Sequence, residues 1–274
     1  MLEDSLRAAV ERLPPGWSGT FFERVGSTQD EARAAARRGT PSRSVFVADE
    51  QTAGRGRHGR RWLAASGSAL LVSIVFRHAQ PAPVPWQYTS LVSLALAEGI
   101  ELVVPHARPA IKWPNDLVLD GRKVAGVLAE SSFDGEHLLV VVGAGLNVNA
   151  APDDLADAAT SLRAVAGERV DRGELLRTFV GRLDAWLARP VQEAQAAWQR
   201  RLWGRGQRLR LVDVGPEQVP RLADVHPEQA LRLADLRPEQ ALSVVVLGVE
   251  PNGALRVRLP DGSERRTTTG ELLP

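Results

Sequence analysis

The order of strand-like and helix-like segments between residues 44 and 142 constrains the fold more than any other feature of the sequence. Apolar or β-rich runs occupy residues 44–48, 69–76, 111–113, 117–119, 123–130 and 138–142. A run with helical apolar spacing, residues 86–102, interrupts them. Asp120 and Gly121 separate two of the runs and predict a tight β-hairpin. The middle of the chain is therefore expected to combine strands with helices.

Helices are also predicted on both sides of this region. A short helix over residues 5–13 would end at Pro14. Thr28, with Glu31 three positions later, has the pattern of a capping box, and Gly39 follows the last turn of that helix. Residues 175–187 form one amphipathic helix, and residues 191–203 a second.

The pattern changes beyond Gly206. Short strands are predicted over residues 243–249, 255–259 and 265–269, separated by Asn-Gly and Asp-Gly turns. We therefore expect a domain of residues 1–205 and a small all-β domain of residues 206–274. Pro-Glu-Gln recurs with a period of 11 at positions 216, 227 and 238, which indicates a repeated insertion near 213–240 in a surface loop.

Composition excludes several kinds of chemistry. The 274 residues include no Cys, so disulfides, cysteine-ligated zinc and a thiolate nucleophile are absent, and the five His show no zinc-protease spacing. The net charge of +1 gives no strongly basic face for duplex nucleic acid. No apolar stretch is long enough to span a membrane, and the start lacks the basic residues of a signal peptide. We expect a cytoplasmic protein with no membrane partner.

A Gly/Arg loop, residues 54–62, lies in a stretch without acidic residues. Its glycines, Gly54, Gly56 and Gly59, alternate with Arg55, Arg57, Arg60 and Arg61. Glycines let backbone amides approach an anion, and guanidinium groups bind carboxylate or phosphate through two-point contacts. No Gly-Lys-Ser/Thr follows, so this is not a Walker A loop. The pattern predicts a polyphosphate site, with a solvated basic turn or a single-strand RNA contact as alternatives.

A second constellation follows at residues 112–116, Lys-Trp-Pro-Asn-Asp. Lys112, Asn115 and Asp116 supply a cation for phosphate, an amide for a purine edge and a carboxylate for magnesium. An ordinary strand followed by a Pro-Asn turn is the alternative. Lys123 lies in an otherwise apolar run, so its side chain faces either solvent or a ligand.

Five segments, taken in order, resemble the successive signatures of biotin protein ligases. They are Ser27-Thr28, residues 51–62 (QTAGRGRHGRRW), residues 112–116 (KWPND), residues 122–126 (RKVAG) and residues 143–149 (GAGLNVN). The resemblance implies a mixed α/β catalytic domain, similar in shape to lipoate ligases and class II synthetases, followed by a small SH3-like β-barrel. It also implies activation of biotin with ATP to biotinyl-5'-AMP, and transfer to a lysine of biotin carboxyl carrier protein, a subunit of acetyl-CoA carboxylase.

The resemblance assigns residues to each substrate. Biotin would contact Ser27, Thr28, Gln29, Gln51, Gly54, Arg55, Gly56, Arg57, Lys123, Gly126 and Gly143. ATP, with Mg²⁺, would contact Arg57, Arg60, Trp62, Lys112, Asn115, Asp116 and Asn147, with Trp62 near the adenine. The cations expected to act in catalysis are Arg57, Lys112 and Lys123; the metal ligands are not predicted. Gln29 stands where many relatives have Asn, and His58 interrupts a loop that often has another basic residue.

Other functions stay open at this point. A lipoate or octanoate ligase would have a similar architecture, although the 51–62 segment favours biotin. A biotin-responsive repressor would need a DNA-binding domain, and the residues before the motif region leave no room for a helix-turn-helix, so we expect no specific DNA binding. An RNA-binding role lacks aromatic platforms beyond Trp62. The sequence leaves open whether the protein is a monomer or a homodimer.

Overall fold

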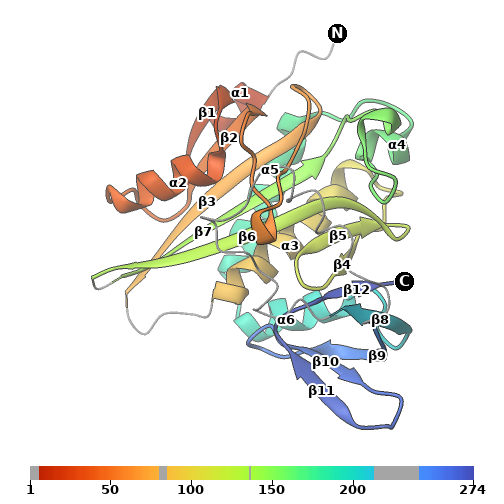
Figure 1. Cartoon of the computed structure of the whole chain (residues 1–274). Helices are drawn as coiled ribbons and strands as arrows, with labels where there is room; N and C mark the ends of the chain where they lie inside the picture. Colours follow the sequence, from red (N-terminus) through yellow and green to blue (C-terminus); the bar gives the residue numbers. More distant parts are fainter. Residues whose placement is uncertain (1–5, 80–84, 136, 213–240) are drawn as a thin grey trace.

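The computed structural model describes residues 6–79, 85–135, 137–212 and 241–274. These residues form a seven-stranded mixed sheet and a five-stranded antiparallel sheet (Figure 1). The larger sheet has the order β1 (Ser18–Val25), β2 (Ser44–Gln51), β3 (Ala69–Ala79), β7 (His137–Asn147), β6 (Arg122–Asp134), β5 (Asp116–Leu119) and β4 (Ala110–Lys112). Only β1 and β2 are parallel neighbours among the described strands of this sheet. The predicted mixed α/β class is confirmed.

The hairpin predicted from Asp120 and Gly121 joins β5 to β6. Both residues have positive φ, 49° and 77°, as the tightest hairpin turns require. The next two strands extend well beyond their predicted apolar runs. β6 continues to Asp134 and β7 to Asn147. β7 lies between β3 and β6 and is hydrogen-bonded on both sides, so its glycines remain in the strand.

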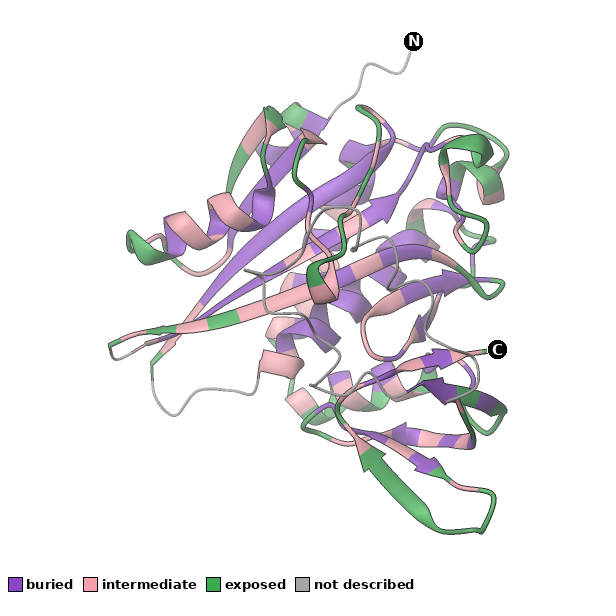
Figure 2. Ribbon diagram, in the orientation of Figure 1, coloured by how far each residue is buried: buried purple, intermediate pink, exposed green. Residues whose placement is uncertain are grey.

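The strand β1 was not predicted. It lies at the edge of the sheet, paired only with β2, and none of its residues is fully buried. A strand that is half exposed on both faces has no clean alternation of apolar and polar residues, so the pattern that identifies strands is missing. β3, in contrast, is buried along most of its length (Figure 2).

Helices cover the two faces of the large sheet unequally. α1 (Leu6–Val10), α3 (Pro85–Val103) and α5 (Arg172–Leu187) share the main hydrophobic core with one face. On the other face α2 (Thr28–Arg37) packs three alanines, Ala32, Ala35 and Ala36, against side chains of β2, β3 and β7. This leaves part of the second face, over β6 and β7, to be covered by the Gly/Arg loop (Figure 1).

The predicted capping box at the start of α2 is wrong. Ser27, not Thr28, is the N-cap residue, and it makes no side-chain cap bond. The Thr28 hydroxyl instead lies 3.1 Å from Gln51 Oε1 and 2.9 Å from Ser73 Oγ. Tertiary hydrogen bonds therefore replace the local cap. The end of α2 is as predicted, since Gly39 has φ of 91° and its amide donates to the Ala36 carbonyl.

The helix predicted over residues 191–203 is shorter than expected. α6 (Val191–Arg200) ends early because the Ile111 amide and carbonyl bond to Arg201 and Trp203, which adds the chain to the outside of β4. Short helical segments, not predicted, occur at η1 (Arg57–Gly59), η2 (Pro152–Asp154) and α4 (Leu162–Ala166). Among the described residues no helix is both long and apolar enough to cross a membrane.

The smaller sheet has the order β11 (Glu264–Thr267), β10 (Leu255–Arg258), β9 (Leu242–Val249), β8 (Arg208–Val212) and β12 (Glu271–Leu273). The three strands predicted here are present, whereas β8 and β12 were missed. The sheet is fixed to the rest of the chain in part by Trp113, whose Nε1 donates to the Gly253 carbonyl at 3.0 Å. We propose 205/206 as the domain boundary. The repeated insertion at 213–240 lies outside the described residues.

Candidate functional site

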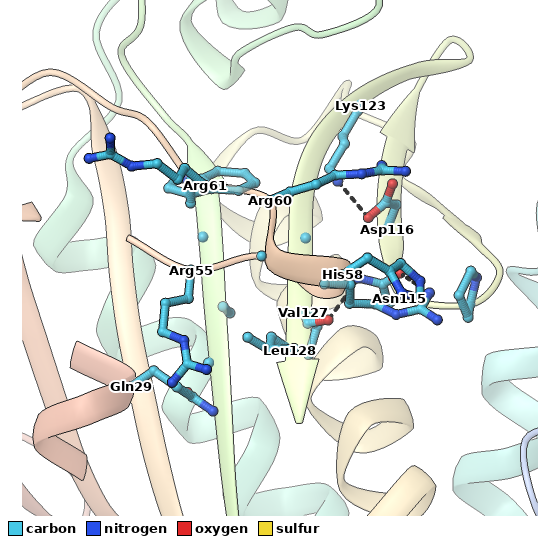
Figure 3. A pocket seen from close by; sticks show the side chains of 18 of the residues that line it. Gln29, Arg55, His58, Arg60, Arg61, Asn115, Asp116, Lys123, Val127 and Leu128 are labelled. Carbon is cyan, nitrogen blue, oxygen red and sulfur yellow. Dashed lines mark hydrogen bonds and ion pairs between the residues drawn. The ribbon is translucent and has the colours of Figure 1, made fainter. Parts of the chain in front are cut away.

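A cavity lies where the Gly/Arg loop crosses β6 and β7 (Figure 3). Its walls come from the start of α2, the loop, β3, the β4–β5 turn, β6, β7 and β12. The predicted site residues that line it are Ser27, Thr28, Gln29, Gln51, Arg55, Gly56, Arg57, Arg60, Trp62, Lys112, Asn115, Asp116, Lys123, Gly126 and Gly143. The fold thus brings residues of all five sequence segments to one place.

Glycines form the floor of the cavity. Side chains alternate along a strand, so Gly143 and Gly145 of β7 face the same side of the sheet, and Gly126 of β6 is paired directly with Gly145. A Cβ atom on Gly145 would lie only 2.5 Å from the Trp62 indole. The indole can therefore lie against the strand backbone only because this position has no side chain.

One end of the cavity carries neutral hydrogen-bonding groups. Gln51 Oε1 accepts from the Thr28 amide at 2.7 Å. Gln29 Nε2 donates to Glu130 and to the Val141 carbonyl, both at 3.1 Å, so its Oε1 faces Ser73, whose hydroxyl donates to it at 3.1 Å. The buried Ser27 hydroxyl has no hydrogen-bond partner among the described residues. These hydroxyls and amides suit a neutral polar ligand.

The two ends of the Gly/Arg loop, Gly54 and Trp62, are held close together and form a narrow, pinched base. The Trp62 amide donates to the Gly54 carbonyl at 3.0 Å, and a Cβ on Gly54 would lie 2.4 Å from the Trp62 carbonyl oxygen. Gly56 donates to Arg60 at 2.8 Å. This narrow base directs the intervening arginines across the sheet and toward the cavity.

The other end of the cavity gathers charged groups. Lys123 Nζ lies 2.7 Å from Asp116 Oδ1, and Arg57 Nη1 donates to Asn115 Oδ1 at 3.0 Å. Glu271 of β12 lies 3.6 Å from Lys112 Nζ and 3.5 Å from Arg60 Nη2. The smaller sheet therefore supplies a carboxylate to a site built mainly by the larger one.

Burial disfavours the charged forms of Arg57 and His58. Loss of solvent lowers the pKa of Arg57, and the Asp116 and Glu271 carboxylates partly oppose that shift. Burial also lowers the pKa of His58, and Arg57 and Arg60 lower it further. An anionic ligand at this end would relieve both effects, because it supplies the negative charge that solvent no longer screens.

The chain is similar to known proteins in both sequence and fold. The sequence model of the Biotin/lipoate A/B protein ligase family matches residues 21–147. The Biotin--[acetyl-CoA-carboxylase] ligase of Mycobacterium tuberculosis is 34% identical over 226 residues, which cover 79% of this chain and 83% of that protein. This chain belongs to the biotin protein ligase family.

Two further relatives show how far the similarity extends. The Bifunctional ligase/repressor BirA of Bacillus subtilis is 32% identical over 217 residues, and the match covers 76% of this chain but only 66% of that protein. The biotin protein ligase of Aquifex aeolicus, solved in complex with biotin and ATP, has a TM-score of 0.68 at 24% identity and covers 93% of this chain and 97% of that one. The fold of this family therefore extends over most of the chain.

Two predicted site residues do not line the cavity. Gly54 lies at the pinched base of the loop. Asn147 is buried at the end of β7, where its Nδ2 donates to the Thr160 carbonyl at 3.1 Å. Gly54 therefore shapes the loop and Asn147 fixes the connection after β7; their contacts with biotin and ATP remain predictions.

Other residues at the cavity were not predicted from the sequence. Ser73 lies in an apolar strand and Glu271 near the end of the chain, and neither belongs to a recognised segment. Glu130 does not line the cavity itself, but its carboxylate accepts from Gln29, which does. Among the described residues, no group of three or more His, Asp or Glu side chains is placed to hold a metal ion.

Proposed function

We propose that the protein activates biotin with ATP to biotinyl-5'-AMP and transfers the biotin to a lysine of a biotin carboxyl carrier protein. The observation that carries the proposal is the division of the cavity, with neutral amides and hydroxyls at one end and Arg57, Lys112 and Lys123 at the other. Biotin has the same division, a neutral ureido ring at one end and a carboxylate at the other. ATP then supplies a second anion for the charged end.

The neutral end would hold the ring of biotin. Ser27 has an unpaired hydroxyl, and Thr28 and Gln51 hold each other in fixed orientations, so these groups are organised before a ligand arrives. Because Gly143 has no side chain, Gln29 can lie against the strand backbone and form this wall of the cavity. Preorganised partners lower the entropic cost of binding.

The charged end would carry out the first chemical step. A carboxylate oxygen of biotin attacks the α-phosphorus, an acyl phosphate anhydride forms, and pyrophosphate leaves. Two anions approach each other in this step, so fixed positive charge must be concentrated where they meet. Arg57 and Lys123 supply it, each held by a neighbour, Asn115 for Arg57 and Asp116 for Lys123.

ATP would extend from Trp62 toward Lys112 and Arg60. The indole offers an apolar face for the adenine, and the two cations, both paired with Glu271, would bind the phosphates. Asp116 and Glu271 are the carboxylates available to an Mg²⁺ ion bound with ATP, which usually takes one or two protein carboxylates and keeps several waters. That ion would add positive charge near the departing pyrophosphate.

In the second step the ε-amine of the acceptor lysine attacks the acyl carbon. An amide forms, AMP leaves and the amine loses a proton. The relatives named for acetyl-CoA carboxylase suggest that its carrier subunit is the acceptor. We also propose a cytoplasmic location; a homodimer stays a prediction that size-exclusion chromatography with light scattering tests.

Competition between acids tests the proposal. Purified protein, ATP and magnesium are incubated with biotin or with lipoate, and acyl adenylate and labelled carrier domain are measured by mass spectrometry. We expect biotinyl adenylate and a biotinylated carrier, with little lipoyl product. Efficient use of lipoate would assign the protein to the other branch of its family, and no product with a folded sample would refute the ligase.

Replacing Gly145 with alanine should weaken ATP binding. The new methyl group would overlap the Trp62 indole, so the ring must leave the floor. We expect the KM for ATP to rise about tenfold, because one aromatic contact with the adenine is lost. Gly181→Ala is the matched control, because nothing lies within 4 Å of a Cβ there. An unchanged KM for ATP in Gly145→Ala would remove Trp62 from the nucleotide site.

His58 should make ATP binding depend on pH. Burial, with Arg57 and Arg60 nearby, holds its pKa below 6.5, and bound phosphate would raise that pKa again. Proton uptake then accompanies binding, so the KM for ATP should fall about threefold between roughly pH 7.5 and 5.5. ATP protonates over the same range, so the His58→Asn variant is the reference. Identical pH profiles for the two proteins would contradict this account.

A further inference from the structure

Four charged side chains form a closed ring beside the neutral end of the cavity. Arg55 Nη1 lies 2.7 Å from Asp30 Oδ1, and Arg55 Nη2 lies 3.1 Å from Glu130 Oε1. Arg33 lies 2.8 Å from the same Asp30 oxygen and 3.7 Å from the same Glu130 oxygen. Positive and negative groups thus alternate around the ring, and Figure 3 shows Arg55 directed toward Gln29.

The ring joins a loop to two fixed elements. Asp30 and Arg33 lie on α2, one turn apart, and Glu130 lies on β6. Arg33 contacts both carboxylates, so it holds them in place whether or not the loop is present. Arg55 is the member that comes from the Gly/Arg loop. Its two ion pairs therefore fasten the loop to both sides of the cavity.

Glu130 also reaches the cavity wall. Its second oxygen accepts from Gln29 Nε2 at 3.1 Å, which fixes the amide with Oε1 toward Ser73. Gln29 is 4% exposed and lies over Gly143, where an added Cβ would be 2.6 Å from Gln29 Oε1. One carboxylate thus holds both the loop and a buried wall residue.

We propose that Asp30 and Glu130 are positioning residues that latch the Gly/Arg loop over the bound acid through Arg55, and that Glu130 couples this latch to the orientation of Gln29. The inference rests on the proposed function for the identity of the ligand. In this arrangement Arg55 fastens the loop as well as lining the cavity. Opening of the latch lets biotin enter, and its closure slows biotin release.

The first test needs no ligand. Trypsin cleaves after arginine, so the rate of nicking within the Gly/Arg loop reports how often the loop opens. Glu130→Gln should be nicked about fivefold faster than the native protein, because it loses one well-placed ion pair with Arg55. Asp30→Asn is a second variant with the same expected result. Arg37→Gln is the matched control, since Arg37 also lies on α2 but is exposed and outside the ring; its nicking rate should match that of the native protein.

The second test uses turnover. Glu130→Gln should raise the KM for biotin about fivefold while kcat and the KM for ATP stay near native values. Arg55→Gln should do the same, and the double variant should be no worse than either single variant, because both remove one latch. High salt, roughly 0.5 M, should bring the native KM for biotin toward that of the variants.

These outcomes distinguish failure of the latch proposal from failure of the proposed ligase function. Equal nicking of Glu130→Gln and native protein, or multiplied KM effects in the double variant, overturns the latch even if the native protein makes biotinyl adenylate. Faster nicking of both carboxylate variants supports the latch even if biotin proves to be the wrong acid.

Discussion

Replacing Lys123 with alanine is expected to slow biotinyl-adenylate formation by about 100-fold to 1000-fold, the usual effect of removing one group that stabilises charge in a transition state. The ammonium group lies in the cavity 2.7 Å from Asp116, and 5.9 Å from the centre of the Trp62 ring. Its loss removes positive charge where two anions must meet and leaves the Asp116 carboxylate unbalanced. Single-turnover adenylate formation measures the change.

Two companion variants make this result specific. Arg122→Ala removes a neighbouring cation that is exposed and outside the cavity, so its rate should be native. Lys123→Arg keeps a positive charge beside Asp116, so its rate should lie closer to native than that of Lys123→Ala. The melting temperature of Lys123→Ala should stay close to native, since the side chain is 39% exposed. Native turnover of Lys123→Ala would exclude Lys123 from the chemistry.

Replacing Leu183 with alanine should have the opposite effect, a loss of stability without a loss of chemistry. Leu183 of α5 is fully buried in the main core, on the face of the sheet opposite the cavity. Truncation removes apolar contacts and leaves a void, so we expect the free energy of unfolding to fall by about 2–5 kcal/mol.

Urea denaturation measures that loss. Leu102→Ala makes the same change at a position that is 61% exposed, and it should alter stability by less than about 0.5 kcal/mol. Below the unfolding transition, the KM for biotin of Leu183→Ala should be native. Equal stabilities of the two leucine variants would contradict the core described for α5.

The parts of the fold that the sequence predicts are those with local causes. Asp120 and Gly121 force a hairpin because few residues tolerate positive φ, and the leucines of residues 175–187 repeat with the helical period. β1 has no such signal, because an edge strand buries too little on either face. Thr28 has the sequence of a cap, yet its hydroxyl is used by Gln51 and Ser73, which are distant in the chain.

The site residues also divide into those with a local sequence signal and those that only the fold brings together. Arg57, Lys112 and Lys123 lie in compact segments whose residue types suit anion binding, and all three line the cavity. Glu271 approaches Lys112 and Arg60 only because the smaller sheet packs beside β4, and no pattern within either segment encodes that distance. Glu130 meets Arg55 only after β6 pairs with β7 and the loop crosses them.

A crystal structure with a non-hydrolysable biotinyl-adenylate analogue tests the account most directly. We expect the ureido ring beside Ser27, Thr28 and Gln51, the phosphate between Arg57 and Lys123, and the adenine against Trp62. A ligand bound outside this cavity, or one whose phosphate lies away from both cations, would contradict it.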